Sequence, residues 1–126
     1  MKKRLFALML AMMLVFTATA LAATRADEVF ASASASLSSG KSATFRAQTQ
    51  TYTNTISVVS VSLYVKTGNT WTYARSLPAP STSSSGINFS ASKDYSAYIG
   101  SGTYRINATF NADGYTIARS SGEVTF

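Results

Sequence analysis

Residues 55–77 read TISVVSVSLYVKTGNTWTYARSL, and they contain the strongest structural signal in the chain. Residues 55–66 are rich in β-branched and aromatic side chains, which favour strands. Residues 67–70 (TGNT) have the composition of a hairpin turn. Residues 71–77 follow with a second run of strand-forming side chains. We therefore predict two antiparallel strands joined by a tight turn.

The alternation of apolar and polar residues in the first of these strands slips once. Ile56 and Val58 share one face. The apolar residues that follow share the other face: Val59, Val61, Leu63 and Val65. An extra residue in one strand re-aims its side chains in this way, so we predict a β-bulge at the two consecutive valines.

The length of the turn fixes which residues of the two strands face each other. A loop of two or four residues gives these pairs: Lys66 with Trp71, Val65 with Thr72, Tyr64 with Tyr73, Leu63 with Ala74, Ser62 with Arg75, and Val61 with Ser76. A three-residue loop would instead place Arg75 opposite Leu63 on the apolar face. Because a slip of one residue flips every side chain of a strand, burial of the apolar residues favours the first register.

This register predicts an exposed aromatic face on the hairpin. Its proposed ligand-binding residues are Tyr64, Trp71 and Tyr73, with Lys66 and Arg75 at the rim. Exposed aromatic rings with cationic neighbours suit stacking against a sugar or contact with a protein partner. The alternative is a purely structural role, because each cross-strand pair stabilises a hairpin by about 0.2–1 kcal/mol and cation–π contacts add to this.

The rest of the chain continues the same pattern of short alternating segments. The further predicted strands are 29–37, 42–49, 87–91, 103–110 and 115–126, the last with a kink at Ser121-Gly122. Polar, Gly-rich or Pro-containing connections separate them: 38–41, 50–54, 78–85 and 111–114. We expect one helical turn within 93–100, with Ser92 as its cap and Asp94 in its first turn.

Seven strands without βαβ alternation predict an all-β domain over residues 29–126. We expect an antiparallel two-sheet sandwich of about seven strands, with a barrel as the alternative.

A short motif resembles the tyrosine corner of immunoglobulin-like and fibronectin-III-like sandwiches. Residues 101–106 read SGTYRI, and Tyr104 stands two residues before Ile106, at the position that antibodies fill with cysteine. Residues 94–100 resemble the loop before this corner. The resemblance implies an immunoglobulin-like topology, with the Tyr104 hydroxyl bonded to backbone upstream. The chain departs from the family in lacking the disulfide and in the position of Trp71.

The N-terminus has the three parts of a secretory signal peptide. Residues 2–4 are basic, residues 5–16 are apolar, and residues 20–22 (ALA) have the spacing that a signal peptidase cleaves. The apolar run is shorter than the roughly 20 residues needed to cross a bilayer. We therefore expect residues 1–22 to form a cleaved signal helix and the domain to be secreted, with an uncleaved membrane anchor as the alternative.

Cleavage after Ala22, with Ala20 or Ala23 as neighbouring alternatives, leaves residues 23–28 as a flexible N-terminus. Three of the eleven basic residues leave with the signal, so eight remain against five acidic ones and the net charge falls from +6 to +3. A charge this small, without runs of one sign, predicts no nucleic-acid partner. No further apolar run follows, so we expect no stable membrane anchor after cleavage.

The chain contains no cysteine, which is unusual for a small secreted domain and leaves stability to packing and sheet hydrogen bonds. This composition suits export by a Gram-positive bacterium. The whole chain also resembles small secreted proteins of clostridial-type bacteria, a resemblance that implies a compartment and no mechanism.

Few residues in the chain could perform chemistry. Histidine and cysteine are absent, and the five carboxylates are scattered among the mature N-terminus, turns and the last strand. Residues 111–114 (NADG) are similar to the start of a calcium loop, but the acidic ligands that should follow are missing, so a turn is the better interpretation. We therefore predict a protein that is not an enzyme and has no metal or cofactor.

Residues 31–36 (ASASAS) support a different hypothesis. Small side chains give a flat strand, and a flat edge can pair with a second copy of the chain. The protein would then be a structural or matrix component with weak self-association through its edge strands. The alternative is an ordinary first strand that packs closely on its neighbour.

Overall fold

The computed structural model describes residues 29–126, which are predominantly β-strand. The predicted signal peptide 1–22 and the segment 23–28 lie outside the described residues. Among residues 29–126, no helix has the length and hydropathy needed to cross a membrane. The strands are β1 (Phe30–Leu37), β2 (Ser42–Thr67), β3 (Thr70–Leu77), β4 (Ser83–Asp94), β5 (Thr103–Ala112), β6 (Tyr115–Ser120) and β7 (Val124–Thr125).

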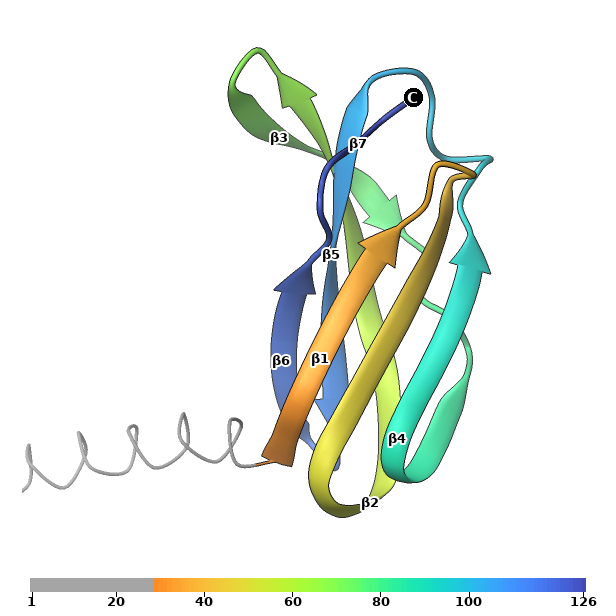
Figure 1. Ribbon diagram of the computed structural model, residues 1–126, viewed down its shortest axis with the longest axis vertical. Helices are drawn as coiled ribbons and strands as arrows, with labels where there is room; N and C mark the ends of the chain where they lie inside the picture. The colour runs from red at the N-terminus through yellow and green to blue at the C-terminus, as the bar shows by residue number, and fades with distance from the viewer. Residues whose placement is uncertain (1–28) are drawn as a thin grey trace, which may run out of the picture.

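All seven strands belong to one curled antiparallel sheet, so the all-β prediction is confirmed. The long strand β2 organises it. Its residues 43–49 pair with β1 and its residues 42–57 with β4, whereas residues 61–67 pair with β3 and residues 56–65 with β5. Strand β5 then pairs with β6 and β7. Figure 1 shows β2 folding back on itself, which brings the β1 and β4 side of the sheet in front of β5.

The bend in β2 corrects the predicted loop at residues 50–54, because these residues stay in extended conformation. The Thr53 hydroxyl donates to the carbonyl of Gly86 at 2.8 Å. On the other side of the bend, the Asp113 carboxylate accepts hydrogen bonds from the amides of Asn54 and Thr55 at 3.0–3.1 Å. These bonds come from distant segments, so the bend needs no turn sequence of its own.

The predicted bulge in β2 is confirmed, since the β2–β5 register shifts between Val58 and Ser60. The predicted change of face is wrong. Ile56, Val58 and the later residues Val61 and Leu63 are all buried. Val59 is the extra residue and is 51% exposed. The bulge therefore keeps the apolar side chains before and after it on the core side of the strand, because it cancels the slip in the sequence pattern.

A second bulge changes the faces of β1. The β1–β2 register shifts between Phe30 and Ser32, so Phe30 is buried in the core although strict alternation would place it on the same face as Ser32 and Ser34. Burying the large apolar ring of Phe30 stabilises the fold, whereas strict alternation would leave this ring exposed to solvent.

The core lies between the two halves of the curled sheet. Phe110 of β5 packs edge-on against Phe45 of β2 and Phe89 of β4, with ring centroids 6.5 and 6.4 Å apart. The other fully buried large side chains surround this group: Tyr95, Ile56, Leu63, Ile106 and Val61. Strands that are far apart in sequence thus share one core.

The segment after β4 holds a single turn. The amide of Tyr98 donates to the carbonyl of Tyr95, and the amide of Ser96 donates to the Asp94 carboxylate at 2.9 Å. These residues form a turn and not a helix, so the predicted helical turn capped by Ser92 is wrong. The bonds from Ser96 lower the pKa of the Asp94 carboxyl. Tyr95 fills the core below the turn, and its hydroxyl donates to the carbonyl of Pro78 at 2.7 Å.

The corner before β5 contains the bond that the family resemblance implies. The Tyr104 hydroxyl donates to the carbonyl of Ser101, although the distance of 3.4 Å is long for a hydroxyl. Gly102 has a φ of 133°, and a Cβ there would lie 3.3 Å from the Tyr104 ring. Glycine is therefore required at this position both by the backbone and by the neighbouring ring.

The last two strands confirm a predicted turn and a predicted kink. Asp113 and Gly114 both have positive φ in the two-residue turn between β5 and β6. Between β6 and β7, the Ser121 hydroxyl accepts from the amide of Ile106, and the Ser121 amide donates to the Ile106 carbonyl. Ser121 thus continues the hydrogen bonding to β5 between the end of β6 and the start of β7.

Candidate functional site

The β2–β3 hairpin follows the predicted register only near its turn. Lys66 pairs with Trp71, Val65 with Thr72 and Tyr64 with Tyr73, as predicted. The register then shifts, so that Leu63 faces Arg75, Ser62 faces Ser76 and Val61 faces Leu77. The predicted partners Ala74, Arg75 and Ser76 for Leu63, Ser62 and Val61 are therefore wrong. The shift brings the apolar Leu77 into the core beside Val61, where the regular register would have placed Ser76.

The shift moves Arg75 away from the aromatic rings with which it was grouped. Arg75 lies opposite Leu63 and is exposed, but it projects to the face of the hairpin opposite to Tyr73, since directly opposed residues project to the same face. Its guanidinium lies over the ring of Tyr98, 4.6 Å from the centroid. The prediction that Arg75 borders the aromatic face is wrong.

Arg105 of β5 occupies the place that Arg75 was expected to take. It pairs with Tyr64 across the β2–β5 ladder. Its guanidinium lies 4.5 Å from the centroid of the Trp71 ring and 5.8 Å from that of Tyr64. The alternation of residues 103–110 points Arg105 away from the core, but the pairing of β5 with β2 cannot be deduced from the sequence.

Lys66 completes this cluster. Its ammonium nitrogen lies 5.9 Å from the centroid of the Trp71 ring and 3.3 Å from the Glu123 carboxylate. We call the cluster of Tyr64, Lys66, Trp71, Tyr73 and Arg105 the aromatic face. Four of its residues lie on the β2–β3 hairpin, which extends beyond the ends of β1 and β6 (Figure 1), and Arg105 lies on β5.

The rings of the aromatic face differ in how open they are. Tyr73 is 56% exposed, whereas Tyr64 and Trp71 are partly buried. Tyr64 and Tyr73 contact edge to face with centroids 5.8 Å apart. Because cations lie over the indole, Tyr73 presents the most accessible ring. The face can stack against a planar or sugar ring and offers charged donors beside it.

The carboxylates within residues 29–126 are already engaged. Asp94 accepts from the Ser96 amide, Asp113 from two backbone amides, and Glu123 pairs with Lys66. Within the same part of the chain, no group of three or more His, Cys, Asp or Glu side chains gathers to hold a metal.

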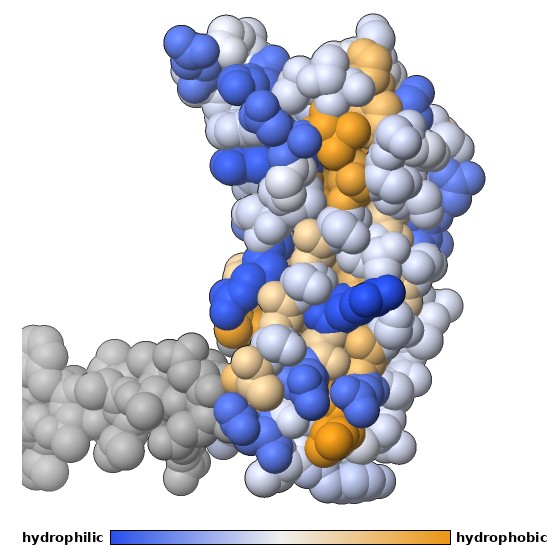
Figure 2. All heavy atoms as spheres, viewed as in Figure 1, coloured by the Kyte–Doolittle hydropathy of each residue, from blue (hydrophilic) through white to orange (hydrophobic). Residues whose placement is uncertain are grey.

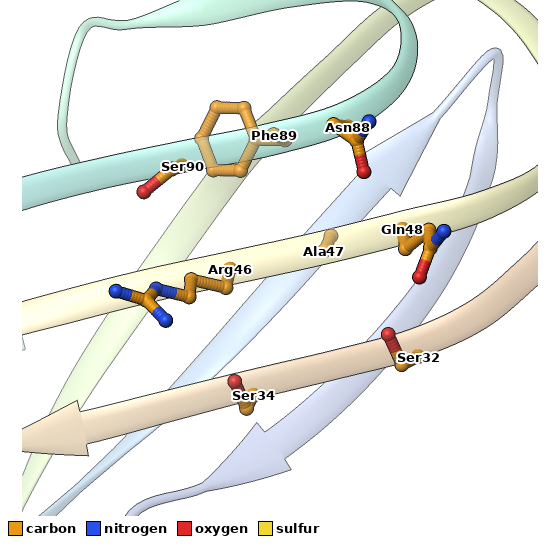
Figure 3. Close-up of a pocket in the computed structure, with 8 residues that line it drawn as sticks. All are labelled: Ser32, Ser34, Arg46, Ala47, Gln48, Asn88, Phe89 and Ser90. Atoms are coloured by element: carbon orange, nitrogen blue, oxygen red, sulfur yellow. The ribbon is translucent and has the colours of Figure 1, made fainter.

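A second surface lies on the other half of the sheet. It is a shallow hollow of about 620 Å³ across the outer side of β1, β2 and β4 (Figure 3). Its lining residues are Ser32, Ser34, Arg46, Ala47, Gln48, Asn88, Phe89 and Ser90. The alternation in the sequence points several of these side chains outward. It does not reveal the hollow, because that depends on which strands are neighbours.

Comparison with known proteins finds no relative of this chain. No protein-family model, curated protein or solved structure matches the chain.

Proposed function

We propose that this is a secreted, non-enzymatic protein that binds an extracellular glycan or protein through the aromatic face. The observation that carries the proposal is the register at the hairpin turn. It brings three aromatic rings together, and the β2–β5 ladder adds Arg105 beside them. Aromatic residues and arginine are the side chains most enriched in the parts of binding surfaces that contribute most energy.

We further propose that the fold is an immunoglobulin-like sandwich of two layers. One layer would contain β1, the first half of β2 and β4. The other would contain β3, the second half of β2, β5 and β6. The strand pairings support this division, as does the packing of Phe45 and Phe89 against Phe110. The bond from Tyr104 to Ser101 supports the same family.

Secretion is part of the proposal and is supported by the sequence of residues 1–22 alone. The chain contains no cysteine, so outside the cell the domain would depend on packing and sheet hydrogen bonds for its stability.

The second candidate function is self-association through edge strands. Strand β1 pairs with β2 along one side, and among the described residues no ladder covers its other side. Its outward side chains are small and exposed, as in Ser32, Ser34 and Ser36. An edge of this kind can accept a strand from a second copy. In that case the molar mass measured by light scattering should rise with protein concentration.

Affinity measurements on two alanine variants test the binding proposal. We expect Trp71→Ala to weaken binding to a glycan array or to purified cell-wall polysaccharide by about 30-fold or more, the effect of a residue worth about 2 kcal/mol. Tyr52→Ala is the matched control, because Tyr52 is 69% exposed in the bend of β2, outside the aromatic face. Equal binding by wild type and Trp71→Ala, or equal losses in both variants, would contradict the proposal.

A further inference from the structure

The outer side of β1, β2 and β4 carries polar side chains in regular cross-strand rows. Ser34, Arg46 and Ser90 form one row, and Ser32, Gln48 and Asn88 form the next. Rows two residues apart lie about 7 Å from each other along the strands, and neighbouring strands lie about 4.8 Å apart. Short serines beside the longer Arg46 and Gln48 side chains produce the hollow in Figure 3.

The next row along the same three strands, Ser36, Thr44 and Ser92, differs from these two. The hydroxyls of Thr44 and Ser92 share a hydrogen bond of 3.4 Å, and the Ser36 hydroxyl donates to the carbonyl of Thr44. In contrast, within residues 29–126 none of the six polar side chains of the first two rows makes a hydrogen bond to the protein. Their donors and acceptors are therefore available to a ligand.

Arg46 gives the hollow a positive charge with no partner among the described residues. Each of the three carboxylates in residues 29–126 is held elsewhere, by Ser96, by the bend of β2 or by Lys66. A guanidinium presents paired donors that match the two oxygens of a carboxylate. The charge therefore favours a ligand that bears a carboxylate.

The surroundings of Arg46 indicate the rest of the ligand. Hydroxyls and amides lie on three sides of it, and these groups exchange hydrogen bonds with sugar hydroxyls. Ala47 and Phe89 direct their side chains into the core, so they add no apolar anchor for a peptide side chain. Figure 2 shows mostly white and blue atoms over this side of the molecule, with orange confined to separate patches.

We propose that this hollow binds an acidic saccharide, with the Arg46 guanidinium on the sugar carboxylate and the neighbouring hydroxyls and amides on the sugar hydroxyls. The site is separate from the aromatic face, because it is formed by β1, the first half of β2 and β4. The hollow would therefore bind an acidic saccharide even if the aromatic face binds no ligand.

Binding of oligogalacturonate, a carboxylated sugar oligomer, tests this proposal by calorimetry or NMR titration. We expect wild type to bind the free acid at least 10-fold more tightly than the fully methyl-esterified oligomer, which keeps the ring but loses the charge. Arg46→Gln should remove this preference, since the amide keeps polarity but not the guanidinium. Arg119→Gln is the matched control, because Arg119 is exposed on β6 and bonds only the carbonyl of Ala118.

Several results would overturn the proposal. One is equal affinity for the acid and the ester, and another is an equal loss in Arg46→Gln and Arg119→Gln. Absence of binding to the free acid at millimolar concentration would do the same. Trp71→Ala separates this site from the aromatic face: retained oligogalacturonate binding supports the hollow, whereas loss in this variant places the ligand on the aromatic face and contradicts the inference.

Discussion

Phe110→Ala is expected to lower the free energy of unfolding by about 3–5 kcal/mol, the usual range for removing a buried phenylalanine. Phe110 has no exposed surface, and it contacts the rings of Phe45 and Phe89 edge-on. Truncation removes both aromatic contacts and leaves a cavity where the two halves of the sheet meet. Urea unfolding followed by circular dichroism measures the loss.

The control for this experiment is Tyr52→Ala, which should change stability by no more than about 0.5 kcal/mol because the side chain is exposed. A cost below about 1 kcal/mol for Phe110→Ala would mean that β2, β4 and β5 do not share one core.

Tyr95→Ala is expected to have an effect of similar size, about 3–5 kcal/mol, because the ring is fully buried beneath the turn after β4. Tyr95→Phe isolates the hydroxyl. It removes only the bond to the carbonyl of Pro78 and should cost about 0.5–1.5 kcal/mol. A cost for Tyr95→Ala no greater than that for Tyr95→Phe would contradict the burial of the ring.

The same residue predicts a dependence of stability on pH. Burial raises the pKa of Tyr95 from 10.0 to about 12, with a smaller contribution from Tyr98. The folded state thus favours the neutral phenol, so this contribution to stability is complete below pH 10 and is lost as the pH rises towards 12. Urea midpoints between pH 8 and 11.5 should fall more steeply for wild type than for Tyr95→Phe. Parallel curves would show that Tyr95 titrates normally.

Local features of this fold could be predicted from the sequence because neighbouring residues determine them. The turn at Gly68-Asn69, the turn at Asp113-Gly114 and the bulge at Val59 each depend on residue types within a few positions. The continuous path of β2 through residues 50–54 could not be predicted, because Asp113 and Gly86 hold that bend from distant segments.

In the candidate site too, features that depend on neighbouring residues could be predicted, whereas features that depend on distant segments could not. Tyr64, Trp71 and Tyr73 lie close to one turn, and their grouping follows from its register. Arg75 was misplaced because burial of Leu77 shifts the register further along the hairpin. Arg105 was missed because its position depends on a pairing between strands about forty residues apart in sequence. Tyr95 was missed as a core residue because its segment resembles a polar turn.

The claim that Tyr64, Trp71, Tyr73 and Arg105 form one ligand-binding face can be tested most directly by the fluorescence of Trp71, the only tryptophan in the chain. We expect the emission of a partly exposed indole that shifts or is quenched on titration with purified cell-wall polysaccharide. In the free protein, Arg105→Gln should change this emission, because the guanidinium lies 4.5 Å from the ring centroid, whereas Arg75→Gln should not. Emission typical of a buried indole, unaffected by Arg105→Gln and by the polysaccharide, would contradict the account.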